Sequence, residues 1–198
     1  MNITIIDSGA GNLKSIYNFF ERNFKSNLKV QNSPSLFIDN SDILVLPGVG
    51  HFGHVANFIR ESKLDQSIKN FASNNKPLLG ICLGAQLLTK SSEESPGTEG
   101  LGLIDANCVS LSKHPIYKNN IPRIGWSEIK SNNRISYYFV HSFFIQVNRL
   151  NPDLEVTNCI DDVTAMVNHG KISAMQFHPE KSDICGKEIV SNFIEKNV

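Results

Sequence analysis

The sequence lacks the features that would mark a nucleic-acid-binding, secreted or membrane protein. Its 198 residues carry 19 lysines and arginines against 19 aspartates and glutamates, so the formal net charge is zero and no basic excess indicates nucleic acid. No apolar run is long enough to span a membrane. The first residues read as a strand and lack the basic and apolar regions of a signal peptide. We expect a globular protein of the cytoplasm that binds neither nucleic acid nor membrane.

The cysteines are few and far apart. They are Cys82, Cys108, Cys159 and Cys185, and no C-x-x-C pair occurs. This spacing argues against a disulfide framework or a zinc site and suits a reducing compartment. We expect neither a metal nor a cofactor. No repeat, low-complexity segment or linker is visible, so residues 1–198 are predicted to form a single domain.

The most informative segment is Gly80-Ile-Cys82-Leu-Gly84, which follows a short apolar run after Pro77. A G-x-C-x-G pentapeptide between a strand and a helix is the cysteine form of the nucleophile elbow. Glycines are needed there because a Cβ would clash with the neighbouring backbone. The elbow places the thiol at the N-terminus of the next helix, where free amides and the helix dipole stabilise a thiolate. An isolated cysteine is usually a small buried hydrophobe, but the two glycines favour a nucleophile.

The order of predicted elements indicates an α/β protein. Strands are predicted at 3–6, 28–31, 42–46 and 77–81, with helices at 13–24, at 54–74 and after Cys82. A glycine-rich turn at Pro47–Gly50 could aim backbone amides into a cleft. The second half is predicted to be mostly antiparallel, with strands at 103–104, 108–111, 134–140, 154–157, 163–167 and 172–177. A hairpin turn is predicted at 168–170, and a helix at about 184–196 closes the chain.

A nucleophilic thiol needs a base, and His178 is the best candidate among six histidines. In His178-Pro179-Glu180 the two titratable side chains are two residues apart. In an extended chain they point the same way, so Glu180 could accept a hydrogen bond from one ring nitrogen and leave the other free for the thiol proton. This is the nucleophile, base and orienter arrangement of a catalytic triad. A surface turn with an incidental ion pair is the plainer interpretation of the tripeptide alone.

These motifs resemble the class I (triad) glutamine amidotransferases. More closely, the chain is similar to the glutaminase subunits of imidazole glycerol phosphate synthase, nearly end to end. The segments that carry the likeness are 6–12, 46–53, 80–88, 100–104, 121–126, 138–142 and 176–182. The resemblance implies a three-layer fold, with a central, mostly parallel sheet, helices on both faces and an antiparallel strand-rich second half.

The resemblance also implies a division of labour among residues. Cys82 would attack the amide of L-glutamine, His178 would carry the proton and Glu180 would orient it. The oxyanion would meet the amides of Leu83 and of Val49 or Gly50. A further set would bind glutamine or face a (β/α)₈ cyclase subunit that receives the ammonia in a heterodimer. The glutamine-binding residues are Gly48, Gln86, Glu94, Ser142 and Phe143, and those at the partner interface are Asn12, Arg123 and Trp126.

Four departures from the family pattern leave the pathway open. Ser8 replaces a usual Tyr, Ala85 a usual Met, Ser127 a usual Asn and Phe143 a usual Tyr. None removes a catalytic group. The alternative pathway is a related amidotransferase subunit that supplies ammonia for amidination of a surface-polysaccharide sugar. A cysteine protease or related hydrolase, and a non-catalytic binding subunit, are the competing classes. Gln86 argues against the first, and the intact Cys82, His178 and Glu180 argue against the second.

Overall fold

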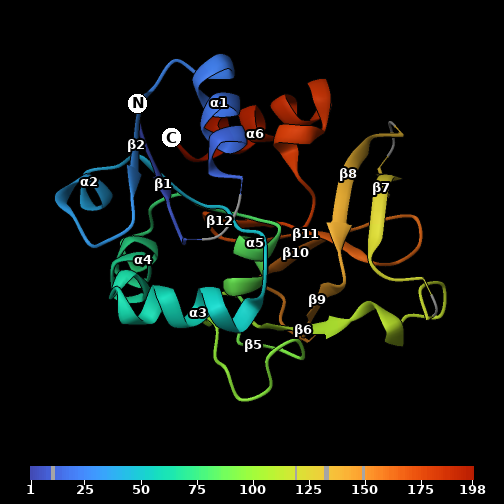
Figure 1. Ribbon diagram of the computed structural model, residues 1–198. Coiled ribbons are helices and arrows are strands. Elements are labelled where there is room, and N and C mark those ends of the chain that lie inside the picture. Colours follow the sequence, from blue (N-terminus) through green and yellow to red (C-terminus); the bar gives the residue numbers. More distant parts are fainter. Residues whose placement is uncertain (10–11, 119, 132–133, 149) are drawn as a thin grey trace.

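A seven-stranded sheet lies at the centre of the computed structural model, which describes residues 1–9, 12–118, 120–131, 134–148 and 150–198 (Figure 1). From β12 to β2 neighbouring strands are parallel, whereas β10 and β11 run antiparallel to their neighbours. The predicted α/β class with a mostly parallel sheet is confirmed. In spatial order the strands are β10 (Leu154–Asn158), β11 (Thr164–His169), β12 (Ile172–Met175), β4 (Leu78–Ile81), β3 (Ile43–Leu46), β1 (Asn2–Ile6) and β2 (Asn27–Gln31).

Helices cover both faces of this sheet. On one face lie α1 (Leu13–Asn23) and α6 (Asp183–Asn197), and on the other lie α3 (Phe52–Glu61), α4 (Leu64–Ser73) and α5 (Leu83–Leu87), as Figure 1 shows. Successive strand residues alternate between the two layers, so Val45 packs with α1 and α6 while Leu46 packs with α3 to α5. Burying each such side chain contributes about 1.5–3 kcal/mol. The central strands are therefore apolar on both faces, as their sequences predict.

The antiparallel second half adds two small sheets. One contains β5 (Ser91–Ser92), β6 (Ala106–Ser110) and β9 (Phe143–Val147), and the other pairs β7 (Arg123–Glu128) with β8 (Ser136–His141). The chain leaves β8, bends at Ser142 and enters β9 in the other sheet. The sequence did not predict β7 or β9. β7 contains Gly125 at φ +129°, and β9 follows β8 after one residue, so neither has the boundaries expected of a separate strand.

The prediction of one continuous helix at 54–74 was wrong. It divides into α3 and α4 because Lys63 adopts a left-handed conformation, with φ +60°. A short helix, α2 (Leu36–Asp39), also lies outside the prediction and buries Ile38 on the α4 side of the sheet. The hairpin turn between β11 and β12 is confirmed, with Gly170 at φ +56°. Residues 103–104, which are described, do not form the predicted strand, and α6 closes the chain as expected.

Candidate active site

Cys82 lies at the sharp turn between β4 and α5. Its backbone has φ +52° and ψ −110°, a strained conformation for a residue with a side chain. A Cβ on Gly84 would lie 1.8 Å from the carbonyl oxygen of Leu46, and one on Gly80 would lie 2.8 Å from Cα of Ala85. The predicted steric need for both glycines is confirmed. β4 is an interior strand, and the thiol leaves its carboxyl end, where open α/β sheets bind their ligands.

His178 reaches this turn from the neighbouring strand. β12 runs parallel to β4, with Met175 paired to Ile81, and the Cys82 N–H donates to the carbonyl of Met175 at 2.8 Å. Beyond β12, Nδ1 of His178 lies 2.8 Å from Oε1 of Glu180, and both side chains are almost fully buried. The sequence-predicted base and orienter are thus in contact, and the base lies at the carboxyl end of the strand beside the cysteine.

The local geometry of this contact differs from the prediction. Residues Pro179–Lys181 form a 3₁₀ turn rather than an extended segment. Proline is compatible with the first position of such a turn because its φ is already helical. Gly186 on α6 packs directly beneath, where a Cβ would lie 1.9 Å from the Pro179 carbonyl oxygen. The i to i+2 contact is therefore made by a tight turn packed on the closing helix.

The charge state of His178 follows from its neighbours. Burial by itself lowers the pKa of this imidazole, but hydrogen bonding to Cys82 and to Glu180 and the negative charge of both raise its pKa to about 10. Nε2 is buried and makes no well-aligned hydrogen bond with any described residue. Its interaction with the Cys82 thiol therefore raises the pKa through proximity, without the geometry of a good hydrogen bond. These neighbours favour the protonated form of His178.

Ser182 was not predicted and holds the histidine in place. It is fully buried, its Oγ donates to the carbonyl of His178 at 2.6 Å, and it accepts the N–H of Tyr138 at 2.9 Å. The His178 N–H in turn donates to the Tyr138 carbonyl at 2.9 Å. Ser182 thereby fixes the backbone of His178 to β8. Its place four residues after the histidine was the available signal, but a serine at a helix start is usually only a cap.

The Pro47–Gly50 turn lies beside the elbow. The N–H of Leu83 donates to the carbonyl of Gly48 at 3.3 Å. Because the carbonyl and N–H of a trans peptide point in opposite directions, the N–H of Val49 is directed away from Leu83. Gly50 has φ +106°. The amides of Leu83 and Val49, which are expected to receive an oxyanion, therefore lie near each other. In this conformation the Leu83 N–H is occupied by the Gly48 carbonyl, and the Val49 N–H is turned away.

A cavity of about 300 Å³ opens in front of the thiol. Glu94 accepts the N–H of Phe52 at 2.7 Å, which fixes one carboxylate oxygen. Nε2 of Gln86 donates to the Phe143 carbonyl at 2.8 Å. The structure thus gathers most of the predicted substrate and oxyanion residues around Cys82, whereas Gly48 lines a small adjoining cavity beside His178. The lining residues are Val49, Gly50, Cys82, Leu83, Gln86, Glu94, Pro122, Val140, His141, Ser142 and Phe143.

A second buried histidine, His141, lies in the wall of this cavity. Its Nδ1 is 2.8 Å from the Phe143 carbonyl, so Nδ1 carries the proton because a carbonyl can only accept. Burial lowers the pKa of His141, and the positive charges of Arg123 and His178 act in the same direction, so the pKa falls to about 3 despite the raising effects of the Phe143 carbonyl and Asp161. His141 is therefore a neutral imidazole, and the sequence did not distinguish it from the other histidines.

The residues predicted at a partner interface have different surroundings. Trp126 is 52% exposed on β7, beside Ile124 at 63%. Arg123 is 5% exposed, lies 3.0 Å from Asp161 and stacks over Phe139. A direct interface role for Arg123 is not compatible with this burial, and the side chain instead anchors β7 to the protein interior. The neighbours of Arg123 in the sequence, Pro122 and Ile124, gave no signal for its burial.

Asn12 is exposed and caps α1, with its side chain accepting the N–H of Ser15 at 3.3 Å. The two residues before it in the motif, Ala10 and Gly11, lie outside the described residues. Asn12 and Gly48 both line the small cavity that also includes His178 and Glu180. Asn12 is therefore near His178.

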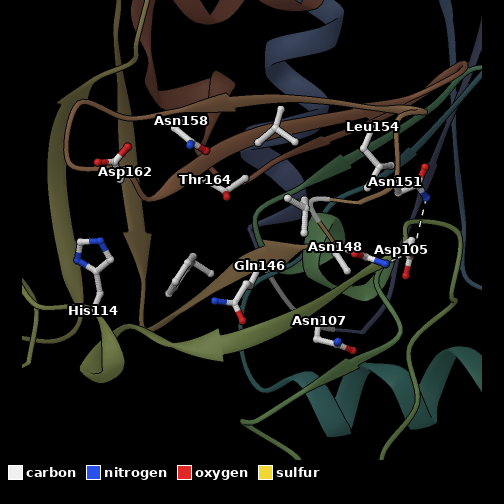
Figure 2. Close-up of a pocket in the computed structure, with 14 residues that line it drawn as sticks. Asp105, Asn107, His114, Gln146, Asn148, Asn151, Leu154, Asn158, Asp162 and Thr164 are labelled. Atoms are coloured by element: carbon white, nitrogen blue, oxygen red, sulfur yellow. Dashed lines mark hydrogen bonds between the residues drawn. The ribbon is translucent and has the colours of Figure 1, made fainter.

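A cavity of about 830 Å³, larger than the one in front of the thiol, lies on the other side of β9 (Figure 2). Phe143 lines the cavity in front of the thiol, whereas Phe144 and Gln146 line this one. Its walls are rich in carboxamides, and Asp105 is paired with Lys90. It contains no cysteine, so size alone does not identify the reactive site.

The described part of the chain lacks two further kinds of site. It contains no group of three or more His, Cys, Asp or Glu side chains placed to hold a metal ion. Within the same residues, no helix is both long and apolar enough to cross a membrane. All four cysteines are free.

Comparison with known proteins decides the family. The glutamine amidotransferase class-I family matches residues 4–197. The chain belongs to this family. It is 39% identical over 205 residues to the imidazole glycerol phosphate synthase subunit HisH of a Prochlorococcus marinus strain, covering 98% of this chain and 94% of that protein. It is 35% identical over 204 residues to the subunit of the same name from Methanothermobacter thermautotrophicus, covering 98% of each.

Solved structures agree on the fold. A crystal structure described as a glutamine amidotransferase has a TM-score of 0.76 and 19% identity, and the match covers 97% of both chains. At this identity the likeness shows the fold alone. The family resemblance, the three-layer fold and the enzyme class predicted from the sequence are confirmed.

Proposed function

We propose that this protein is the glutaminase subunit of an imidazole glycerol phosphate synthase. It hydrolyses L-glutamine to glutamate and ammonia and passes the ammonia to a (β/α)₈ cyclase subunit in a heterodimer. The cyclase makes imidazole glycerol phosphate and aminoimidazole carboxamide ribotide for histidine biosynthesis. The observation that carries the proposal is the buried His178–Glu180 pair just beyond β12, the strand beside the Cys82 elbow. The relatives named as subunits of that synthase support the pathway.

The first half of the reaction uses the thiolate and the imidazolium. Sγ of Cys82 attacks the side-chain amide carbon of glutamine and forms a tetrahedral intermediate. Its collapse breaks the C–N bond, and Nε2 of His178 gives its proton to the leaving nitrogen, so ammonia departs and a thioester remains. Glu180, fixed at 2.8 Å from Nδ1, stabilises the charged imidazole before this transfer.

The second half regenerates the enzyme. The neutral His178 takes a proton from a water molecule, and the resulting hydroxide attacks the thioester carbon. Collapse of the second tetrahedral intermediate expels the Cys82 thiolate and releases glutamate, while His178 keeps the proton. The raised pKa of His178, about 10, returns the site to the thiolate–imidazolium pair for the next cycle.

The cavity residues account for glutamine binding in this proposal. Both Nε2 protons of Gln86 are engaged by the protein, because Nε2 donates to Phe143 O and to Gln176 Oε1. Its Oε1 remains to accept the substrate α-amino group, beside the carboxylate of Glu94. Ser142 and Phe143 close the opposite wall, and Gly48 adjoins the elbow from behind.

The oxyanion hole is completed by rotation of one peptide plane. Rotating the Gly48–Val49 peptide removes its carbonyl from Leu83 and turns the Val49 N–H toward the substrate carbon, with Gly50 providing the backbone freedom. Loss of one oxyanion donor typically costs about 10²–10³ in rate. We infer that the partner raises turnover by favouring the rotated conformation of the Pro47–Gly50 turn.

The partner binds next to the site on the exposed ribbon of β7 and β8. Ile124 and Trp126 are exposed there, and across the ribbon they pair with Val140 and Tyr138. Aromatic residues with apolar neighbours are typical of interface centres. Asn12 extends this surface on the other side of the catalytic histidine. The four free cysteines, including the nucleophile, suit the reducing cytoplasm.

Replacing the nucleophile tests the chemistry. Cys82→Ser should reduce glutaminase turnover by more than about 10⁴-fold, because a serine hydroxyl is not activated by this pair, while circular dichroism and partner binding stay unchanged. Cys185→Ser, a change at a partly buried cysteine on α6, is the matched control and should retain turnover. Mass spectrometry of the unmodified protein after treatment with an electrophilic glutamine analogue should find the adduct on Cys82. An adduct elsewhere, or loss of folding in Cys82→Ser, would contradict the proposal.

The choice of partner decides the pathway. A purified cyclase barrel should raise turnover, and Trp126→Ala should weaken this stimulation, since the indole is 52% exposed beside the site. Leu150→Ala changes an apolar residue that is 91% exposed and serves as the control. Stimulation by a sugar-amidinating ligase instead of the cyclase would establish the alternative pathway and overturn the histidine assignment.

A further inference from the structure

We propose that Gln176 is a positioning residue that stabilises the Cys82 thiolate, with its amide oriented through Gln86 by the main-chain carbonyl of Phe143. Gln176 is the first residue after β12 and is fully buried. The inference rests on the proposed role of Cys82 as nucleophile. It assigns a function to a side chain that has none in the mechanism above.

The orientation of the first amide is set by a backbone atom. The Phe143 carbonyl can only accept a hydrogen bond, so the Gln86 atom 2.8 Å away must be its nitrogen. The same carbonyl accepts the Nδ1 proton of His141. Because Gln86 is 4% exposed, water does not compete freely for this contact. The Gln86 amide therefore has one allowed orientation.

The second amide is oriented by the first. The remaining proton of Gln86 Nε2 points to Gln176, whose nearer atom must accept and is Oε1, at 3.2 Å. The opposite orientation would place two NH₂ groups against each other in the protein interior, which leaves a buried donor unpaired. Nε2 of Gln176 consequently faces Cys82, 4.0 Å from Sγ, a long contact for sulfur.

The donor matters because the other polar neighbour of the sulfur has the opposite effect. The Val140 carbonyl lies 3.7 Å from Sγ and accepts the thiol proton, so it favours the neutral thiol. The Gln176 N–H can only donate, so it favours the thiolate without adding a charge that would compete with His178. Gln176 thus opposes the effect of the Val140 carbonyl on the sulfur.

Two variants of Gln176 separate this role from simple packing. Gln176→Met fills a similar volume and cannot donate. Gln176→Glu can still accept from Gln86 but brings an acidic group to the sulfur. The titratable groups that face Cys82 are His178 and Glu180 on one side, and His141 and Glu94 across the cavity; none is changed in either variant.

The measurement is the alkylation rate of Cys82 by iodoacetamide as a function of pH, read by mass spectrometry on the whole protein. In Gln176→Met we expect the rate at pH 7 to fall about three- to tenfold and the profile to move to higher pH. Gln176→Glu should move the alkylation profile to higher pH by about one pH unit or more, because a negative charge beside the sulfur disfavours the thiolate. The kcat for glutamine should fall in parallel, with KM changed less than about twofold, since Gln86 keeps its bond to Phe143.

Gln146→Met is the matched control, because Gln146 is exposed on β9 and faces the large cavity (Figure 2). It should leave the alkylation profile unchanged. A folded Gln176→Met or Gln176→Glu protein with the profile of the unmodified protein overturns the inference. Alkylation does not require glutamine, so this failure is distinguishable from failure of the proposed function, which Cys82→Ser tests. Should the methionine variant unfold, the glutamate variant and its profile decide.

Discussion

The two buried histidines of the site, His178 and His141, have nearly equal exposure, 2% and 6%, but opposite charge states. Burial lowers the pKa of both. For His178 this effect is exceeded by hydrogen bonds to Cys82 and Glu180, and its pKa rises to about 10. For His141 burial is the largest effect and the positive charges of Arg123 and His178 act with it, so its pKa falls to about 3 despite the Phe143 carbonyl and the charge of Asp161. The neighbours, and not the burial, decide which histidine carries a proton.

This difference assigns the roles. When two titratable groups of a site have pKa values pushed far apart, one can exchange protons and the other stays in a single state. In the proposed mechanism, His178 is the group that holds and returns a proton during turnover. His141 stays neutral and uses its N–H to fix the carbonyl that also orients Gln86. Changes that make the two environments more alike should therefore impair catalysis or alter the pH dependence of stability.

Glu180→Gln should have the largest effect. The substitution removes the negative charge that holds His178 protonated, so its environment becomes closer to that of His141. We expect kcat to fall about 10²–10⁴-fold, measured by glutamate release across the pH range of stability. Glu93→Gln is the control, because Glu93 bonds Lys113 and Ser110 away from the thiol, and it should change kcat less than about twofold. A loss of only a few fold in Glu180→Gln would show that the carboxylate does not determine the state of His178.

His141→Asn should flatten the acid limb of stability. In the unfolded chain the histidine binds a proton below its ordinary pKa of 6.5, whereas in the folded protein it does so only near pH 3, because burial lowers its pKa. The contribution of His141 is therefore complete above pH 6.5 and is lost as the pH falls, by about 1.4 kcal/mol per pH unit. The free energy of unfolding, measured by urea titration at several pH values between 7 and 4, should fall less steeply with falling pH in His141→Asn than in the unmodified protein. His54→Asn, at an exposed histidine, should keep the slope of the unmodified protein, and equal slopes in all three proteins would refute the assignment.

Ser182→Ala should have the smallest effect. It removes the hydroxyl between His178 O and the Tyr138 N–H. The Tyr138 N–H loses this acceptor in the interior, whereas the His178 carbonyl keeps the Lys181 N–H at 3.0 Å. We expect a loss of about 1–3 kcal/mol in the free energy of unfolding and a reduction in kcat of a few fold, with no change at His141. Ser191→Ala on the same closing helix is the control. If both serine variants lose equal stability, Ser182 has no special role in holding His178.

The elbow and the His178–Glu180 contact could be predicted from the sequence because each depends on residues that are close together in the chain. Gly80, Cys82 and Gly84 identify the elbow through sterics that any such turn imposes, and His178 and Glu180 are close in sequence as well as in space. The layers of the core also followed from apolar runs on central strands. These features depend on neighbours a few residues away.

The features that were missed depend on contacts between distant segments. Arg123 is buried because Asp161, 38 residues later in the numbering, and the Phe139 ring meet it in the interior. Gln176 and Gln86 meet across the sheet, and their role depends on the direction of each amide. The break at Lys63 results from packing of two helices and has no glycine or proline to announce it. None of these contacts has a periodic or motif signal.

The pairing of Ile81 with Met175 has a consequence for how the enzyme is controlled. It joins the last residues of two interior strands, where opening of the hydrogen bonds requires nearly global unfolding. The residues that follow, Cys82 and the His178 segment, are consequently assembled in every folded molecule. A regulator cannot switch the enzyme by separating them, so it must act on segments outside the ladder. Amide hydrogen exchange should therefore report regulation at Pro47–Gly50 while the amides of β4 and β12 stay protected.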